Sequence, residues 1–407
     1  MENRQVSEEG VGKRDANILW LTSWYPNESD PYSGDFIKRQ AEAAAIYQTL
    51  KIVYVGKYAP NFYEGRSEIK MAGIAKDNLK ENVLYYPDTG KSNNIFSKIR
   101  SLSRYFRKHK EFIGQLRENK EMPDLVHVHI AMKAGLIALY LNWKYKIPYV
   151  LTEHWSGYYQ QSKDSLFKKS IFEQYLTKLI LKKARLLLPV SQALGIQIDK
   201  YWMKVPFRKI SNVVDTRLFY TAGYKTPGSF RFIHVSSLLY PKNPEGIVSA
   251  FSEMLRQKLN VELVLVGPVN SSLNKFISQQ DIAPGKIIST GEITYEQVGI
   301  EMRKADALVL FSDYENMPCV ILEALCTGIP VIATRVGGIP EVVSEENGIL
   351  INPGDKTELL QAMTRMTLDI SLFDKNKISQ QAADLFSYET IGKKIKVVYD
   401  SLLTKEC

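Results

Sequence analysis

Two glutamates with seven residues between them, Glu315 and Glu323, lie in the segment SDYENMPCVILEALCTGIPVIATRVGGIPEVV, residues 312–343. Pro318 suits the first position of a helix, and Gly328 suits the residue just past its end. Glu315 is therefore expected on the loop before this helix and Glu323 on the body of the helix.

The start of this predicted helix is suited to binding a phosphate. The free backbone N–H groups of Cys319 and Val320 would point out of the helix, and the helix dipole favours an anion at the same end. A nucleoside diphosphate sugar at that position has its sugar on one side and its ribose on the other. Glu315 could then bind hydroxyls of the sugar while Glu323 accepts from the ribose hydroxyls, so the spacing suits a nucleotide sugar.

Strands alternating with helices must position these side chains, and the sequence predicts two such series. The first has strands at 17–26, 50–56, 124–130, 147–154 and 184–191, and helices at 34–47 and 132–145. The second has strands at 230–238, 261–267, 286–290, 306–312, 330–336 and 347–354, and helices at 244–258, 294–305 and 318–328. The polar, turn-rich segment 215–230 is the best linker between them. We therefore expect an α/β protein with two doubly wound Rossmann-like domains and a ligand cleft between them.

The overall composition agrees with a soluble two-domain protein. The 407 residues exceed one ordinary core, and 45% of them are hydrophobic with a mean hydropathy of -0.20. Since no apolar run approaches a membrane span and the first residues are too polar for a signal peptide, we expect a cytoplasmic protein. Three cysteines, Cys319, Cys326 and Cys407, form no CxxC pair and suit a reducing compartment.

Two nucleotide-binding patterns are not met. A dehydrogenase would need G-x-G-x-x-G after an early strand, but no glycine follows the first predicted strand before Gly34. The stretch YYPDTGKS, residues 85–92, has Tyr85 where the first glycine of a phosphate loop belongs. We therefore reject both motifs.

The net charge of +9 is concentrated in the first half of the chain. Residues 1–215 contain 34 Lys and Arg against 22 Asp and Glu, and much of the excess lies in two amphipathic helical patterns at 94–116 and 164–188. One interpretation is the solvated faces of ordinary helices, and another is a surface for anionic lipid or a polyanionic acceptor. No recognised nucleic-acid motif or aromatic-interleaved groove accompanies the charge, so nucleic acid is not expected as a partner.

Segment 312–343 resembles the signature of the retaining, two-Rossmann-domain (GT-B) glycosyltransferases, in the large family that contains sucrose synthase and the sugar transferases of glycolipid pathways. The E-x7-E spacing is in register with P-x-x-x-x-E-A, G-x-P-V and GG-x-P-E. Further segments match in the expected order over nearly the whole chain: SGDFIKRQAEAAA, DLVHVHI, LTEHW, PVSQAL, NVVDTRLF and GEITYEQVGIEMRKADALVLFS.

This resemblance implies roles for individual residues around the donor. It implies Glu315 near the donor sugar, Glu323 at the ribose, and His154 beneath the reacting sugar. Gly34 would let the loop after the first strand approach the donor closely. Three residues would lend backbone N–H groups to the sugar and the phosphates: Asn316, Met317 and Cys319.

One departure from the family pattern concerns the phosphate-binding basic residues. The family usually has G-R-L before its phosphate-binding lysine, whereas this chain has Ser236-Ser237-Leu238 leading to Lys242. Either Lys242 holds the diphosphate with help from Ser237 and the helix start, or another basic residue enters from elsewhere. We find no D-x-D pair in a suitable context, so no metal site and no cofactor are expected beyond the donor substrate.

Five other candidates are expected to have structural roles. His127 and His129, on the strand DLVHVHI, are expected in the core or at the strand end. Gly337-Gly338 and Glu341 are expected to shape the loop after VIATRV rather than to touch substrate.

The resemblance implies three parts of the chain: an acceptor-binding domain at 1–212, a donor-binding domain at 213–387, and a C-terminal helix at 388–407 that returns to the first domain. It implies a metal-independent retaining transferase, with Glu315, His154 and Lys242 at the reacting centre. The enzyme would move a hexose or N-acetylhexosamine onto a hydroxyl of a glycan or lipid-linked acceptor in surface polysaccharide or glycolipid synthesis. Peripheral contact with an anionic membrane at its inner face is an additional expectation.

Three alternatives remain: an epimerase or a phosphorylase on the same scaffold, and an inactive nucleotide-binding subunit. The set of E-x7-E and GG-x-P-E motifs argues against the first two. The missing arginine is the argument for the third. The sequence leaves open whether the donor carries uracil, guanine or adenine.

Overall fold

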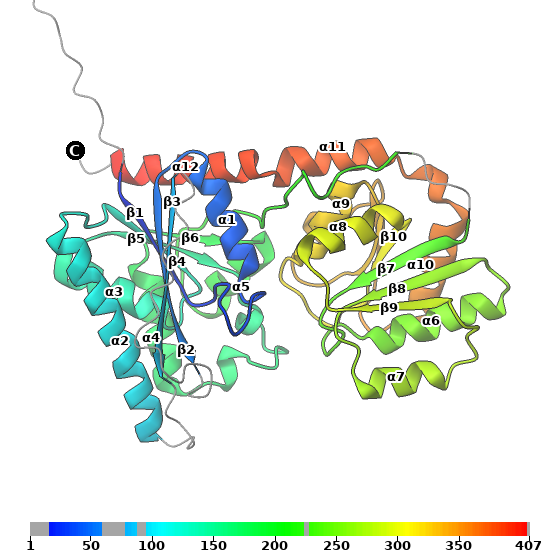
Figure 1. Cartoon of the computed structure of the whole chain (residues 1–407), viewed down its shortest axis with the longest axis horizontal. Coiled ribbons are helices and arrows are strands. Elements are labelled where there is room, and N and C mark those ends of the chain that lie inside the picture. The colour runs from blue at the N-terminus through cyan, green and yellow to red at the C-terminus, as the bar shows by residue number, and fades with distance from the viewer. Residues whose placement is uncertain (1–15, 59–77, 88–94, 224–227, 405–407) are drawn as a thin grey trace, which may run out of the picture.

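The computed structural model describes residues 16–58, 78–87, 95–223 and 228–404 of the chain. These residues form two doubly wound α/β units, as the sequence predicted, each built on a parallel six-stranded sheet with helices on its faces (Figure 1). The central strands are mostly apolar and buried, as expected where helices cover both faces of a parallel sheet, whereas strands at the sheet edges are partly exposed.

The first sheet has the strand order β3-β2-β1-β4-β5-β6. Its strands are β1 (Ile18–Thr22), β2 (Leu50–Tyr58), β3 (Leu79–Pro87), β4 (Leu125–His129), β5 (Tyr149–Glu153) and β6 (Leu186–Pro189). Its helices are α1 (Asp35–Ala45), α2 (Ile95–Glu118), α3 (Ala134–Tyr145), α4 (Ile171–Lys183) and α5 (Gln192–Tyr201).

The second sheet has the order β12-β11-β10-β7-β8-β9. Its strands are β7 (Phe230–Val235), β8 (Val261–Val266), β9 (Ile287–Gly291), β10 (Ala307–Leu310), β11 (Val331–Thr334) and β12 (Gly348–Ile351). Its helices are α6 (Pro244–Arg256), α7 (Ser271–Ser278), α8 (Tyr295–Lys304), α9 (Cys319–Thr327), α10 (Lys356–Leu368) and α11 (Lys375–Phe386).

Several elements were not predicted from the sequence: β3 and the helices α5, α7, α10 and α11. Strand β3 lies at the edge of its sheet and begins LKEN, so the polar residues Lys80, Glu81 and Asn82 interrupt the apolar pattern. An edge strand can carry such residues because only part of its surface is buried. The rejected phosphate-loop stretch begins inside β3 at Tyr85, and its residues 88–92 lie outside the described residues, as does Cys407.

The last helix, α12 (Tyr388–Leu403), returns from the second unit and packs on α1 of the first, as predicted (Figure 1). Gly392 permits this close packing, because a Cβ built there would lie 2.1 Å from the backbone oxygen of Ala43. The Tyr399 hydroxyl at the far end of α12 accepts from Trp20 Nε1 at 2.9 Å and lies 2.6 Å from His127 Nδ1. The end of the chain is therefore tied into the core of the first sheet.

The chain crosses between the two units at two neighbouring places. Val214, just before the predicted linker, donates its backbone N–H to the carbonyl of Phe386, just before α12, at 2.9 Å. The two crossing segments are thus hydrogen-bonded to each other at the hinge. None of the described helices is long and apolar enough to cross a membrane.

Candidate functional site

The loop before α9 and the first turn of α9 form the centre of the candidate site. Glu315 lies on the loop that follows β10, and Glu323 lies within α9, as the sequence predicted. The helix starts one residue later than expected: Pro318 has an extended backbone (φ -68°, ψ 124°) and caps the helix, while Cys319 is its first residue. Gly328 ends the helix in the left-handed conformation (φ 79°), which glycine adopts without strain.

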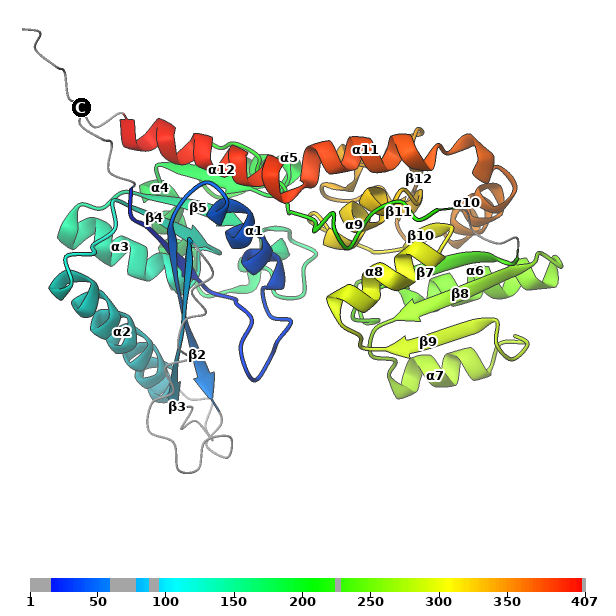
Figure 2. The same ribbon diagram turned by 45° about the horizontal axis from the view of Figure 1, so that its top comes forward.

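The first turn of α9 retains its capacity to bind an anion. Pro318 provides no side-chain cap, so Cys319 and Val320 occupy the turn in which backbone N–H groups have no partner within the helix. The positive end of the helix dipole lies at the same place. In Figure 2, α8 and α9 lie on the side of the second unit that faces the first.

Lys242 and Glu315, predicted separately, are brought together as an ion pair. Lys242 lies on the loop between β7 and α6, and the backbone N–H of Asp313 donates to the Pro241 carbonyl at 2.9 Å, which ties this loop to the one before α9. The two side chains are only 21% and 10% exposed, so the ammonium group is held in place with partial access to solvent. Ser237 lies exposed on the same loop.

Asn316 connects this loop to the first unit. Its Nδ2 donates to the backbone carbonyl of His154 at 3.1 Å, and its Oδ1 accepts from Ser191 Oγ at 2.8 Å. The neighbouring Met317 offers its carbonyl to Asn212 Nδ2 at 2.9 Å. The predicted donor-binding loop and the predicted His154 are therefore in direct contact, through backbone and amide groups.

His154 lies at the end of β5 among aromatic rings. Its ring is 4.7 Å from the ring of Phe36, and its Nε2 is 3.3 Å from Nδ1 of His129. Burial lowers the pKa of His154 to about 3, while Asn212 acts in the opposite direction. The imidazole is therefore neutral at physiological pH.

His127 and His129 lie in the core, as the sequence predicted. His127 Nε2 is 2.7 Å from Thr152 Oγ1, and its ring contacts that of Tyr399. Burial lowers the pKa of His127 to about 3 and that of His129 well below its ordinary value. His127 therefore links β4 to β5 and α12, whereas His129 contacts the imidazole of His154.

Gly34 caps α1 in the left-handed conformation (φ 65°). A Cβ at this position would lie 2.6 Å from the backbone of Trp24, so the loop closes tightly on the protein itself. The turn alone is sufficient to require glycine here. Close approach of Gly34 to a donor stays a prediction.

Glu323 is buried in the interface between the two units. Its Oε1 lies 3.6 Å from a guanidinium nitrogen of Arg39, which comes from α1. Burial raises the pKa of Glu323 to about 7, and the Arg39 charge acts in the opposite direction. The Arg39 guanidinium also lies 4.2 Å over the ring of Tyr295, the first residue of α8.

Glu341 has a wider role than the predicted shaping of its own loop. Its carboxylate accepts from the backbone N–H groups of Gln192 at 3.0 Å and Ala193 at 2.8 Å, at the start of α5 in the first unit. It also pairs with Lys209 at 3.0 Å. A carboxylate at a helix N-terminus is favourable, so this contact holds the GG-x-P-E turn against the first unit.

Gly337 and Gly338 allow that turn to pack closely against the loop that carries Glu315 and against the first unit. A Cβ at Gly337 would lie 2.0 Å from the carbonyl oxygen of Glu315, and one at Gly338 would lie 2.5 Å from the side chain of Ser191. The backbone N–H of Gly338 donates to the Asn316 carbonyl at 2.7 Å. The two glycines therefore support the loop that carries Glu315 and Asn316, as expected for a structural role.

The sequence analysis did not single out several residues that build this arrangement: Arg39, Glu153, Ser191, Asn212 and Tyr295. Four of these five lie inside segments quoted for their resemblance to the family, and the fifth, Asn212, begins one of them. These residues could have been found in the sequence as charged or polar residues at positions that the helical or strand period places on the buried side of an element. Glu153 is the clearest case, because its carboxylate accepts from the Ala131 N–H at 2.7 Å and the Tyr158 hydroxyl at 2.9 Å in the core.

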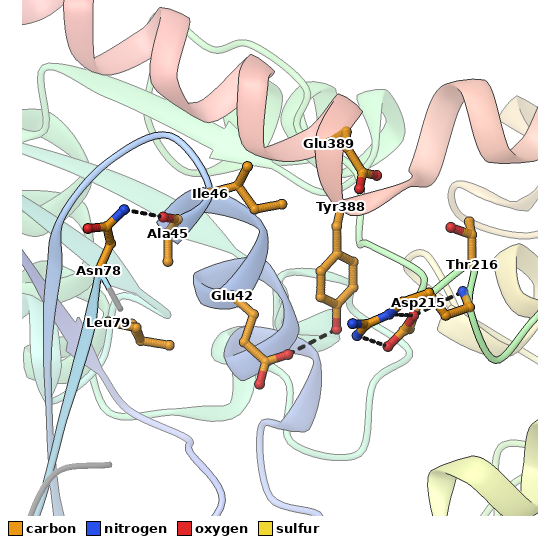
Figure 3. Close-up of a pocket in the computed structure, with 10 residues that line it drawn as sticks. Glu42, Ala45, Ile46, Asn78, Leu79, Asp215, Thr216, Tyr388 and Glu389 are labelled. Atoms are coloured by element: carbon orange, nitrogen blue, oxygen red, sulfur yellow. Dashed lines mark hydrogen bonds and ion pairs between the residues drawn. The ribbon is translucent and has the colours of Figure 1, made fainter. Parts of the chain in front are cut away.

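A separate pocket of about 380 Å³ lies at the hinge, on the side of α1 that faces the linker (Figure 3). The Tyr388 hydroxyl at the start of α12 donates to Glu42 of α1 at 3.0 Å, and Arg217 of the linker forms an ion pair with Asp215 at 2.6 Å. None of the predicted donor-site residues lines this pocket.

Two family profiles match the chain. The profile described as Glycosyltransferase Family 4 matches residues 75–218, and the profile described as Glycosyl transferases group 1 matches residues 223–383. The first match covers most of the first sheet, and the second covers the second sheet together with the loop that carries Glu315.

Known proteins are similar over most of the chain. A glycosyltransferase of Methanocaldococcus jannaschii, named as uncharacterized, is 28% identical over 296 residues, which are 71% of this chain and 79% of that protein. TuaC of Bacillus subtilis, a glycosyltransferase assigned to teichuronic acid biosynthesis, is 25% identical over 390 residues, 86% of this chain and 88% of TuaC.

Solved structures share the fold. Sucrose-phosphate synthase from Thermosynechococcus elongatus superposes with a TM-score of 0.77 at 19% identity, covering 97% of this chain and 100% of that one. HepE of Anabaena, in a complex with UDP and glucose, superposes with a TM-score of 0.68 at 17% identity, covering 95% and 100%. Both are GT-B structures, and the α/β architecture of this chain is therefore of the same kind.

Proposed function

We propose that this chain, which belongs to the glycosyltransferases of the group 1 family, transfers a hexose or N-acetylhexosamine from a nucleoside diphosphate sugar to a hydroxyl group. The observation that carries the proposal is the meeting of four predicted residues at one place. Lys242 pairs with Glu315, and the adjacent Asn316 donates to the carbonyl of His154 in the other unit. A donor held at the start of α9 would have its sugar next to these four residues.

The diphosphate is the part of the donor that this arrangement is best suited to bind. The first turn of α9 provides N–H donors and a positive dipole end, and Lys242 provides a cation. Charge grows on the leaving diphosphate as the bond to the sugar breaks, so groups fixed there stabilise the transition state more than the ground state. The reaction as proposed requires no metal ion and no further cofactor.

The proposed chemistry is a front-face transfer with retention of configuration. The bond between the anomeric carbon and the phosphate oxygen breaks, and the acceptor oxygen forms the new bond on the same face. The acceptor proton passes to the departing phosphate oxygen, so no protein nucleophile is needed. The neutral imidazole of His154 lies at the end of β5, and we assign it a place beneath the reacting sugar.

The acceptor is proposed to be a glycan or lipid-linked hydroxyl, used in surface polysaccharide or glycolipid synthesis. Exposed apolar residues on α2 support a membrane-proximal acceptor: Phe96, Ile99 and Leu102 are 77%, 59% and 41% exposed, beside the exposed cations Lys98 and Arg100. On α4, Ile171 and Phe172 are 86% and 68% exposed. Such mixed surfaces suit an anionic interface, so we propose peripheral contact with the inner face of a membrane.

One assay separates this function from its rivals. The purified protein is incubated with UDP-, GDP- and ADP-sugars, with and without a glycan or lipid acceptor fraction, and nucleotide and sugar products are measured. A transferase gives free nucleoside diphosphate and a glycosylated acceptor whose anomeric configuration, read by NMR, matches the donor. An epimerase gives an altered nucleotide sugar without free nucleotide, and a phosphorylase depends on inorganic phosphate. Binding without turnover would identify an inactive subunit and overturn the proposal.

A further inference from the structure

Arg39 is a cation from the first unit that is buried against the donor-binding unit. Its side chain extends from α1 and is only 9% exposed. It pairs with Asp35 at 2.5 Å on its own helix and lies 3.6 Å from Glu323 on α9. Its guanidinium also lies 4.2 Å over the ring of Tyr295.

The guanidinium is not fully satisfied in this position. Its Nε is buried and has no hydrogen-bond partner among the described residues. Burial raises the pKa of the thiol of Cys319, the first residue of α9, and the nearby Arg39 charge acts in the opposite direction. A cation at the positive end of a helix dipole is unfavourable by itself, and an unpaired buried donor adds to the cost. Both costs fall if an anion binds at the start of α9.

The donor-binding unit itself provides few cations for a diphosphate. The family pattern has an arginine where this chain has the exposed Ser237. The remaining basic residue of that loop, Lys242, is already paired with Glu315. A guanidinium is well matched to phosphate oxygens, because it can donate two parallel hydrogen bonds.

We propose that Arg39 contacts the diphosphate of the donor at the first turn of α9 and replaces the arginine that is absent at Ser237. This assignment rests on the proposed function and identifies a catalytic residue in the opposite unit. On donor binding Arg39 turns from Glu323 to the phosphates, which leaves the Glu323 carboxylate to accept from the ribose. The cation then reaches the diphosphate only when α1 lies against α9, so donor binding and contact between the two units are coupled.

The competing explanation is that Arg39 only stabilises the contact between α1 and α9. Its removal would then weaken the binding of every ligand at the interface to a similar degree, whether or not the ligand carries phosphate. A phosphate contact instead makes the loss depend on the diphosphate. Comparing UDP and GDP with uridine and guanosine therefore separates the two explanations.

The test measures dissociation constants for wild type and for Arg39→Met, by calorimetry for UDP and GDP and by ligand-observed NMR titration for the two nucleosides. We expect Arg39→Met to weaken diphosphate binding about 10- to 100-fold, in line with a lost charge-assisted hydrogen bond, and to change nucleoside binding less than about twofold. Arg217→Met, which removes an exposed arginine at the hinge, is the matched control and should change neither.

A restoring variant makes the test specific. Adding Ser237→Arg to Arg39→Met should recover at least about tenfold of the lost diphosphate affinity, since it returns a guanidinium to the position the family uses. Arg39→Lys keeps the charge but loses the two-pronged geometry, and it decides the question by the same comparison if Arg39→Met does not fold.

Three outcomes would overturn the assignment of Arg39 alone, and a fourth would overturn the proposed function with it. Equal losses for diphosphate and nucleoside, or an unchanged diphosphate affinity in a folded Arg39 variant, would remove Arg39 from the phosphate site and leave the proposed function intact. Failure of Ser237→Arg to restore any affinity would do the same. A wild-type protein that binds neither UDP, GDP nor ADP and releases no nucleotide from the corresponding sugars would overturn the proposed function as well.

Discussion

The two units bring groups of opposite character to their shared interface. The first unit holds buried titratable groups at the ends of its strands, where burial lowers the pKa of His154 to about 3 and raises that of Glu153 to about 7, and it places one buried cation, Arg39, against the second unit. The second unit presents a charged pair, Lys242 and Glu315, that keeps some access to solvent. Under the proposed function, the buried groups of the first unit would exclude water from the reacting sugar, and the charged pair of the second unit, together with Arg39, would match the charge of the diphosphate.

Lys242 gives the largest expected effect and tests the role of the charged pair in the second unit. We expect Lys242→Ala to lower turnover roughly 10²- to 10³-fold, as when one fixed donor is removed from an anion-stabilising site. Excess chelator should leave wild-type turnover unchanged, because in the proposed reaction Lys242 and the start of α9 neutralise the leaving diphosphate without a metal ion. Steady-state release of nucleoside diphosphate is the measurement.

Lys275→Ala, on the exposed surface of α7, is the control for that prediction. Unimpaired turnover in Lys242→Ala would place the phosphate site elsewhere. Loss of turnover in chelator would require a metal ion.

Glu153 tests the buried groups of the first unit through the pH dependence of the unfolding free energy. Its carboxyl is fully buried between the Ala131 N–H and the Tyr158 hydroxyl, and burial raises its pKa to about 7 from an ordinary value near 4.5. Between these two pH values the unfolded chain loses this proton before the folded chain does. Wild type should therefore lose up to about 3 kcal/mol of unfolding free energy as pH rises from about 4.5 to 7.

Glu153→Gln cannot ionise and should lack that loss. The measurement is the urea unfolding free energy of wild type minus that of the variant across this pH range, which cancels other titrating groups. Glu296→Gln, at an exposed position on α8, serves as the control. A difference that stays constant with pH would mean that Glu153 is ionised in the folded protein.

Glu323 lies where the two kinds of environment meet, because a buried carboxylate of the second unit faces a cation of the first. Its pKa is raised to about 7, and a ribose hydroxyl is best accepted by the ionised form. Affinity for the nucleoside diphosphate should therefore increase as pH rises from 6 to 8. Glu323→Gln should lose about 1.5–3 kcal/mol of binding free energy at the upper end of this range.

The pH series of Glu323→Gln reports only the titration of the nucleotide and other groups, so the difference from wild type isolates this carboxylate. Calorimetry with the tightest of UDP, GDP and ADP is the measurement. Equal affinities at pH 8 would remove Glu323 from the ribose site.

The sequence predicted the local parts of this site better than the contacts between its parts. Local geometry allowed the prediction of Glu315 on a loop and of Glu323 in a helix, since Pro318 and Gly328 mark the two ends of α9. It also placed Lys242 after the first strand of the second sheet. The one-residue error at Pro318 reflects a proline that precedes the helix, a position that the sequence does not distinguish from the first turn.

Contacts between the two units could not be predicted in the same way. The partners of Arg39 and Glu341 lie far away in the sequence, and nothing in a helical or strand period indicates which surfaces meet. The same holds for Asn316, whose predicted backbone role gave no sign of the side-chain bonds to Ser191 and to the His154 carbonyl. The alternation of strands and helices and the resemblance to a family both predicted the fold, and the structure was needed to identify these contacts.

The cationic surface of α2 gives the smallest expected effect and tests whether the charge of the first unit has a use outside the interface. Two cations of α2 are unsuitable for substitution because they have partners within the protein: Arg104 donates to the Pro87 carbonyl at 2.9 Å, and Lys108 pairs with Glu111 at 3.1 Å. Lys98 and Arg100 are exposed beside Phe96 and are better suited to the test. We expect wild type to bind vesicles of phosphatidylcholine with added phosphatidylserine, and to bind less as salt screens the charges. Each cation contributes about 1 kcal/mol at such a surface, so the double Lys98→Glu, Arg100→Glu variant should bind at least about tenfold more weakly.

A Lys275→Glu, Lys356→Glu variant makes the same charge change on the second unit and should bind as wild type does. Equal partitioning of all three proteins in a co-sedimentation assay would mean that the α2 surface is simply solvated.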